Sequence, residues 1–277
     1  MTTLTTPVAA QTAPRPTRPR NWMRALGWTM VVAVLVISVT GIDIRWSRLT
    51  TFPADLVHYL GLMFIPPDVD AVGKAIRATG ESVEMAWLGT VIGVVISFPL
   101  GFLAANSIVP LWVRAPLRVI FALLRAVPEV VIAIIILSVT GLTPFTGALA
   151  IAVGSVGTLS KWGYEAIEGA DPGPIEAARA CGAGRIGVIR WAIWPSVSPE
   201  MLAFWLYRFE INVRASAILG LIGAGGIGSM LTQNVQYRLW STVGTLFIVV
   251  VVVTVIIDQV SGRLRQRIIT GRWSARG

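Results

Sequence analysis

The segment ILGLIGAGGIG, residues 218–228, contains glycines at a spacing that is typical of dinucleotide-binding turns. Gly223, Gly225 and Gly228 follow the pattern G-x-G-x-x-G, in which the backbone approaches a pyrophosphate closely. That chemistry needs a short strand before the glycines and an acidic residue about 20 residues after them. A long apolar run precedes these glycines instead, and the next acid is Asp258. We therefore expect a tight turn that includes Gly226, and not a nicotinamide site.

Charged side chains interrupt two apolar segments of the chain. They are Arg125, Glu129, Arg208, Glu210 and Arg214. A single charge at the centre of a bilayer costs about 2.5–3.5 kcal/mol on insertion scales, so pairing is expected. Because residues four apart share a helix face, the sequence predicts an ion pair between Glu210 and Arg214. Arg125 and Glu129 have the same spacing, with Pro128 between them as a residue that bends helices.

These five side chains also indicate which solute the protein would handle. Three arginines and two glutamates leave one positive charge per subunit if both pairs form. A guanidinium group presents a planar fork to phosphate-like or carboxylate oxygens, so the surplus charge favours an anionic solute. The alternative hypothesis is that the charges only hold helices together or lie near a water-exposed helix end.

The chain has few residues for metal, disulfide or nucleotide chemistry. Cys181 and His58 are its single cysteine and its single histidine, which excludes an internal disulfide and a cluster of such metal ligands. Neither lysine, Lys74 or Lys161, lies in a G-x-x-x-x-G-K-[ST] pattern, so the chain lacks a P-loop. We expect no cofactor and no enzymatic activity, and the apolar segments lack the nucleophile–base set of an intramembrane enzyme.

The composition is that of a membrane protein. Hydrophobic residues make up 55% of the chain and charged residues 13%, with a mean hydropathy of +0.72. Soluble domains have roughly a quarter charged residues. In lipid, backbone polar groups must bond within their own segment, and the apolar runs are continuous, so an all-α membrane protein is predicted. Basic cytoplasmic loops explain the net charge of +9 without a nucleic-acid partner.

Six transmembrane helices account for the apolar runs. They are expected at about residues 27–42, 84–105, 117–141, 144–164, 195–221 and 239–258. Six spans put both termini on one side of the membrane. The tails and the loops of that side carry most of the basic residues, which identifies it as the cytoplasm.

The expected domain organisation follows from these spans. It comprises a disordered basic cytoplasmic tail at 1–24, a first transmembrane helix at 25–43, an external or interfacial segment at 44–80, a core at 81–260 and a basic cytoplasmic tail at 261–277. The core includes a short cytoplasmic helix at 174–188, between the fourth and fifth spans.

The cytoplasmic segment 174–188 has the composition of a short docking helix. Pro174 suits the first position of a helix, and Gly182 stops or bends it. Ala177 and Ala178 form a smooth face that another protein could approach closely. We expect this segment to contact a partner in the cytoplasm.

These residues resemble the cytoplasmic signature of binding-protein-dependent ABC importer permeases, E-A-A-x-x-x-G followed by an apolar pair and proline. The positions that match in register are Glu176, Ala177, Ala178, Gly182 and Pro195. Ala192 and Trp194 stand where the family usually has isoleucine and leucine. The resemblance implies a type I importer architecture in the inner membrane.

A narrower resemblance is to phosphonate permeases of the PhnE type. It lies in RAVPE at 125–129 and in LYRFEINVRASAILGLIGAGGIG at 206–228. It implies a homodimer, an external solute-binding protein, and two cytoplasmic ABC ATPase subunits that bind ATP and magnesium and dock on the 174–188 helix. It also implies a phosphonate-type anion as substrate and places the glycine turn near the outer end of the pathway.

Other substrates and one other mechanism stay open. Phosphite and phosphate are close chemical relatives of phosphonate, and amino-acid permeases share the same loop signature. A secondary carrier would couple protons through the region of Glu210 and Arg214, and it would transport without nucleotide and without the helix that contains Glu176.

Overall fold

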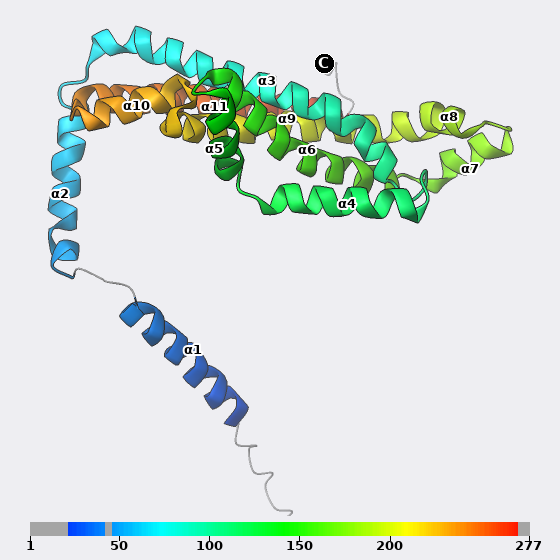
Figure 1. The fold of residues 1–277 in the computed structure, drawn as a ribbon, viewed down its shortest axis with the longest axis horizontal. Coiled ribbons are helices and arrows are strands. Elements are labelled where there is room, and N and C mark those ends of the chain that lie inside the picture. Colours follow the sequence, from blue (N-terminus) through cyan, green and yellow to red (C-terminus); the bar gives the residue numbers. More distant parts are fainter. Residues whose placement is uncertain (1–21, 42–45, 271–277) are drawn as a thin grey trace, which may run out of the picture. The chain divides into compact units, whose positions relative to one another are not determined.

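The computed structural model describes residues 22–41 and 46–270, and all regular elements in these ranges are helical (Figure 1). The chain divides into two units, residues 1–56 and 57–277, and each is described by itself. The all-α expectation is therefore confirmed for the described residues. The expected tail at 1–24 lies outside them, apart from its last three residues.

The first unit contains the apolar helix α1 and the beginning of α2. α1 (Trp22–Gly41) has 20 residues and none of them is buried. Thr29 and Thr40 donate their hydroxyl hydrogens to carbonyl oxygens one turn earlier, so these polar groups are satisfied within the helix. α1 overlaps the expected first transmembrane helix. α2 (Trp46–Phe64) follows it, contains Pro53 and continues into the second unit.

The second unit is a bundle in which α3, α6, α9 and α11 run side by side (Figure 1). Its helices are α3 (Val72–Ala104), α4 (Leu111–Ala126), α5 (Glu129–Thr140), α6 (Pro144–Glu168), α7 (Pro172–Ala180), α8 (Arg185–Val188), α9 (Trp194–Leu219), α10 (Gly226–Gln236) and α11 (Trp240–Thr270). π-type turns at Ile189–Ile193 and Gly220–Ala224 flank α9.

The contact between α3 and α6 forms the centre of this bundle. Gly89 lies against the carbonyl oxygen of Ala148 and the side chain of Ile151, and Gly93 lies against Ser155. Glycine lets the two backbones approach closely, as small residues do in membrane helix pairs. Most residues of α6 are buried, so it faces other helices.

The number of spans is confirmed only in part. By length and apolar composition, 3 helical segments among the described residues could each cross a membrane, namely Trp22–Gly41, Val69–Ala104 and Trp240–Thr270. Up to 5 result if the α4–α5 pair and the pair of Arg185–Ala224 with α10 each count as one span. α6 is not among them, because a helix enclosed by protein is rich in glycine, alanine and hydroxyl residues.

The segment expected as a span at 117–141 contains the bend that Pro128 predicts. α4 and α5 are separate helices with axes bent by 89°. Val127 has extended backbone, with φ −88° and ψ 124°, and Pro128 precedes the first residue of α5. Proline disfavours a helical residue before it, which ends α4 at this point.

Two other helices are longer than the apolar runs indicated. α3 begins at Val72 and not at 84, because Lys74, Arg77 and Glu81 lie on its exposed face. α11 continues to Thr270, so residues 261–270 of the expected tail are helical, and 271–277 lie outside the described residues. A charged residue on an exposed helix face does not end the helix, which is why hydropathy alone made both helices too short.

Gly89→Ala tests the close contact between α3 and α6. The added β carbon would lie 2.7 Å from the Ala148 carbonyl oxygen, a backbone atom that is unable to rotate aside. Overpacking of this kind costs about 1–3 kcal/mol, so we expect a lower midpoint of thermal unfolding in detergent. Gly73→Ala is the control in the same helix, since a β carbon there meets no atom within 4 Å. Equal midpoints for the two variants would contradict the contact.

Candidate functional site

The buried guanidinium group of Arg208 on α9 connects three helices. It forms an ion pair with Glu129, the first residue of α5, and its Nε donates a hydrogen bond to Ser155 Oγ of α6 at 3.0 Å. Only 7% of the Arg208 side chain is exposed, against 25% for Glu129. The Glu129 carboxylate also benefits from the positive end of the α5 dipole. Arg208 therefore ties α5 to the α6–α9 core.

Asn212 lies one helical turn after Arg208 and extends these contacts to α3. Its Nδ2 donates hydrogen bonds to Ser155 Oγ at 3.1 Å and to Thr90 Oγ1 at 2.8 Å. The Asn212 side chain is fully buried, and its Oδ1 has no hydrogen-bond partner within the described ranges. We refer to Glu129, Arg208, Ser155, Asn212 and Thr90 as the α9 polar network.

Sequence reasoning missed three members of the α9 polar network. Asn212 follows Arg208 by four residues, so the same helical spacing that was applied to charges could have found it. Ser155 and Thr90 occur among many small hydroxyl residues on buried faces, and no sequence signal separates them from the rest.

The predicted ion pair between Glu210 and Arg214 is wrong, and Glu129, which has the same spacing from Arg125, pairs with Arg208. Glu210 pairs with Arg265 of α11 at 3.1 Å, and Arg214 pairs with Asp258 of α11 at 2.5 Å. The cause is that α11 packs along α9: Asp258 lies at the expected end of the last span, and the continuation of α11 beyond that end brings Arg265 to Glu210. The Arg265 guanidinium also lies over the Tyr207 ring, 5.3 Å from its centroid.

Arg125 differs from the other predicted pathway residues. Its side chain is exposed, and it has no acidic partner among residues 46–270. Its Nη1 donates a long hydrogen bond of 3.4 Å to the Gly157 carbonyl oxygen. The surplus positive charge expected from the sequence therefore falls on Arg125, at the C-terminal end of α4 next to the bend.

The short helix α7 presents one face to the bundle and one away from it. Asp171 caps it by accepting a hydrogen bond from the Gly173 amide at 2.9 Å. Pro172 and not Pro174 stands at its first position, because the cap precedes it by one residue. Ile175 and Ala178 pack on a buried cluster, whereas Glu176 and Ala177 are exposed.

The segment 174–188 is not one continuous helix. Gly182 has a positive φ of 79°, which turns the chain between α7 and α8. α8 continues through the π-type turn into α9, where Pro195 lies in the first turn. The exposed residues Glu176 and Ala177 thus lie on a short element that is attached to α9 through one glycine turn.

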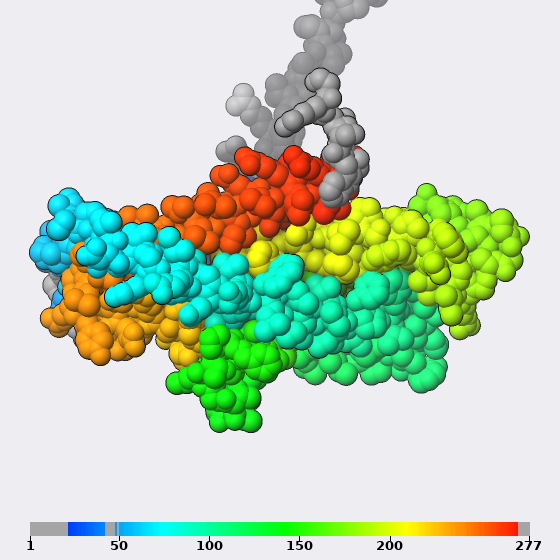
Figure 2. Space-filling view, turned by 90° about the horizontal axis from the view of Figure 1, so that it is seen from above, coloured from blue at the N-terminus to red at the C-terminus, as the bar shows by residue number. Residues whose placement is uncertain are grey.

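The glycines at 223–228 form a tight turn between α9 and α10. Positive φ angles occur at Gly223, Gly225 and Gly226. At Gly228 a β carbon would lie 2.0 Å from the Ala217 carbonyl oxygen, so α10 folds back closely on α9. In Figures 1 and 2, α10 lies at the end of the second unit opposite α7 and α8. The α7–α8 segment and the glycine turn at 223–228 therefore lie at opposite ends of the bundle.

Residues 97–270 match the family described as "Binding-protein-dependent transport system inner membrane component". The chain belongs to this family. Its members are ABC importer permeases, whose subunits have no ATPase site of their own, and the chain is accordingly a multi-pass protein of the inner membrane.

Several curated proteins are similar to the chain. "Phosphate-import permease protein PhnE" of Mycolicibacterium smegmatis is 36% identical over 210 residues, which cover 74% of this chain and 39% of that protein. "Putative phosphite transport system permease protein HtxC" of Stutzerimonas stutzeri is 34% identical over 241 residues, which cover 87% of this chain and 85% of that protein. "Putative cryptic phosphonate transport system permease protein PhnE2" of Escherichia coli is 37% identical over 121 residues, covering 44% and 99%.

Solved structures show the same fold. One of the inward-facing conformations of the MetNI methionine ABC transporter aligns with a TM-score of 0.63 at 19% identity, covering 73% of this chain and 99% of that one. A bacterial ABC transporter involved in the import of alginate aligns with a TM-score of 0.60 at 16% identity, covering 90% and 99%. The helical bundle is therefore of the type I importer kind.

A double-mutant cycle tests the ion pair at the centre of the α9 polar network. Arg208→Gln leaves the Glu129 carboxylate without its cation and should cost about 3–5 kcal/mol, because a partly buried charge then lacks compensation. In E129Q/R208Q neither charge is left, so the loss should be smaller than the sum of the two single losses. Free energies of unfolding in detergent provide the measurement.

Arg125→Gln is the matched control for this cycle, since Arg125 is exposed and has no acidic partner in the described segments. Its free energy of unfolding should stay within about 0.5 kcal/mol of the native value. Strictly additive losses at Glu129 and Arg208 would show that the pair contributes nothing.

Proposed function

We propose that the chain is the transmembrane subunit of an ATP-driven importer of phosphonate-type oxyanions. The observation that carries the proposal is the family match over 97–270 together with relatives named as phosphate, phosphite and phosphonate permeases. Because the chain spans 39% of the length of the Mycolicibacterium relative, its substrate and partners are part of the proposal.

The proposed motor is a separate pair of ABC ATPase subunits that bind ATP and magnesium. They dock on the exposed face of α7, where Glu176 and Ala177 leave a small and accessible surface. Ile175 and Ala178 on the opposite face pack on the cluster that includes Ile193, immediately before α9. A displacement of α7 is passed to α9 and changes which end of the pathway is open.

The proposed topology has six spans, with α6 as the span that other helices enclose. The α7 end of the bundle and both termini face the cytoplasm, and α10 with the glycine turn Gly223–Gly228 faces outward. The position of α7 and α10 at opposite ends supports this arrangement (Figure 2). The external solute-binding protein docks at the outer end, and two copies of the chain form the pathway.

The proposed pathway charges have two different roles. Arg208, Glu210 and Arg214 are held in ion pairs between helices, so they position the pathway. Arg125 has no such acidic partner among the described residues, and its guanidinium group is suited to binding phosphonate oxygens. The pair of Glu210 with Arg265 also favours this proposal over a proton-coupled carrier, since such a carrier would need the Glu210 carboxylate to be free.

Reconstitution in proteoliposomes tests the proposal. With its ATPase and binding protein, the chain should accumulate methylphosphonate or phosphite against a gradient, and sulfate and methionine should not stimulate ATP hydrolysis. The chain alone should accumulate nothing, because it has no P-loop. Uptake by the chain alone under a proton gradient would contradict the motor and establish a secondary carrier. If methionine stimulated ATP hydrolysis and the oxyanions did not, the proposed oxyanion specificity would be wrong.

Ala177→Trp tests the docking face of α7. The side chain is exposed, so the variant should fold normally, but a bulky ring there should separate the two surfaces and lower ATP-driven uptake by roughly tenfold or more. Co-purification of the ATPase provides the second readout. Ala115→Trp is the control, an exposed alanine on α4. Native uptake and native co-purification in Ala177→Trp would rule out docking at this face.

A further inference from the structure

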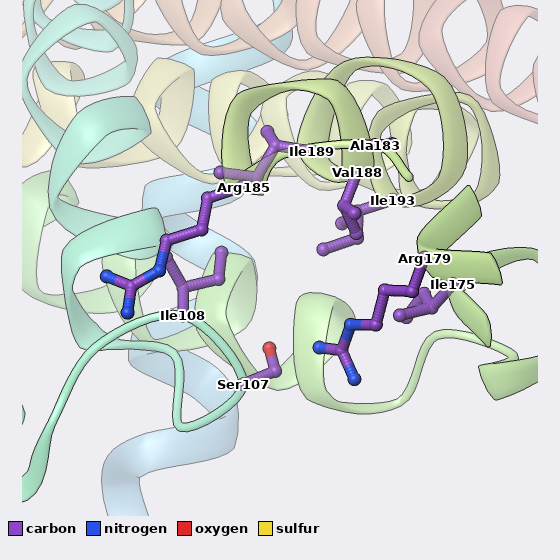
Figure 3. A pocket seen from close by; sticks show the side chains of 9 residues that line it. All are labelled: Ser107, Ile108, Ile175, Arg179, Ala183, Arg185, Val188, Ile189 and Ile193. Carbon is purple, nitrogen blue, oxygen red and sulfur yellow. The ribbon is translucent and has the colours of Figure 1, made fainter. Parts of the chain in front are cut away.

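A pocket of about 320 Å³ lies between α7, α8 and the loop that follows α3. Figure 3 shows the side chains of Arg179 and Arg185 at two sides of this pocket, with Ser107 between their guanidinium groups in that view. Ile108, Ile175 and other apolar residues complete the wall. The pocket shares no residue with the α9 polar network, and neither Glu176 nor Ala177 of α7 lines it.

The two arginines of this pocket have no acidic partner in the described part of the chain. Nearby Arg118 differs, because it forms an ion pair with Glu168 and lies over the Tyr164 ring. The dipole of α7 favours a cation at Arg179, in its last turn, but it gives no reason for Arg185 to line the same pocket. Two like charges facing one pocket are stabilised by an anion between them.

The loop that contains Ser107 is held in place by the bundle. The amide of Asn106 donates a hydrogen bond to Glu168 Oε1 at 2.6 Å, and Arg118 donates to the Ala104 carbonyl oxygen at 2.7 and 3.0 Å. The Ser107 hydroxyl has no hydrogen-bond partner within residues 46–270, so it is free to bind a ligand in the pocket. One wall is thus fixed to α3 and α6, and the other belongs to α7 and α8.

We propose that this pocket binds a phosphate-type oxyanion at the α7 end of the bundle. The planar forks of Arg179 and Arg185 match the oxygens of a dianion, and Ser107 supplies a further donor. The apolar wall accepts the carbon substituent of a phosphonate. The same headgroup chemistry occurs in a free anion and in an anionic phospholipid, and the experiment below separates these sources.

The consequence of binding rests on the proposed function. Arg179 and Arg185 lie on the two sides of the glycine turn at Gly182. An oxyanion that contacts both joins α7 to α8 and opposes the movement of α7 that couples ATP hydrolysis to transport. The transported anion, once accumulated in the cytoplasm, therefore slows further import.

Binding is tested on the full chain in phosphatidylcholine nanodiscs. Inorganic phosphate should raise the midpoint of thermal unfolding above that in chloride at the same ionic strength. Arg179→Gln and Arg185→Gln should each weaken the apparent phosphate affinity roughly tenfold or more, since each removes a charge-assisted contact. Arg190→Gln is the control, because Arg190 lies over the Trp191 ring and outside the pocket. A phosphate effect equal in all four proteins overturns the proposal.

Nanodiscs that contain phosphatidylglycerol identify the source of the anion. If a lipid headgroup occupies the pocket, this lipid abolishes the phosphate effect on the native chain, and it raises the midpoint of the native chain but not of Arg179→Gln. If a free anion occupies it, the phosphate effect is the same in both lipids. The absence of any effect of phosphate and of phosphatidylglycerol on the native chain overturns the proposal.

Transport by the reconstituted complex separates this proposal from the proposed function. Phosphate inside the vesicles should slow ATP-driven uptake by the native complex more strongly than uptake by the Arg185→Gln complex. If the complex takes up oxyanions but the pocket binds no phosphate, the proposal about the pocket fails and the proposed function stands. If the pocket binds phosphate but the complex transports no oxyanion, the proposed function fails and the binding site stands.

Discussion

The ion pair between Arg208 and Glu129 is the constraint on which the bundle depends. In a low-dielectric interior, a charge is tolerated only when an opposite charge and further hydrogen bonds compensate it. Ser155 and Asn212 supply those hydrogen bonds, and Asn212 continues to Thr90 on α3. Four helices therefore have one relative arrangement that satisfies all of these groups, and a shift of α9 along its neighbours would break several contacts together.

The bend between α4 and α5 follows from the same constraint. Pro128 ends α4 by its effect on Val127, and the next residue, Glu129, begins α5 with its carboxylate directed at Arg208. Gly154 of α6 leaves room for this carboxylate, since a β carbon there would lie 2.8 Å from Glu129 Cγ. Proline, glutamate and glycine at these positions therefore act together, and each is needed for a different physical reason.

The sequence predicted the helical class, the importer family and the glycine turn, because each depends on local composition and spacing. It did not predict the ion pairs correctly, because the four-residue spacing on α9 was satisfied by partners far along the chain, such as Arg265 for Glu210. The enclosed helix α6 was expected as a span at 144–164, but it is not among the helices that are apolar enough to cross a membrane alone, since its small residues serve helix contacts. Asn212 shows that a polar side chain on a charged helix face is worth examining alongside the charges.

The place of Pro195 at the start of α9 bears on how a movement of α7 would travel. Ile175 and Ala178 of α7 pack on a cluster that includes Ile193 and Val197, so the two elements share apolar contacts on both sides of this proline. α9 runs from Trp194 to Leu219 with Pro199 inside it, so the end next to α7 and the Arg208 side chain belong to one helix. Under the proposed coupling, a displacement of α7 would reach the Arg208 pair before the glycine turn, so the network that fixes the bundle lies on the route of that motion.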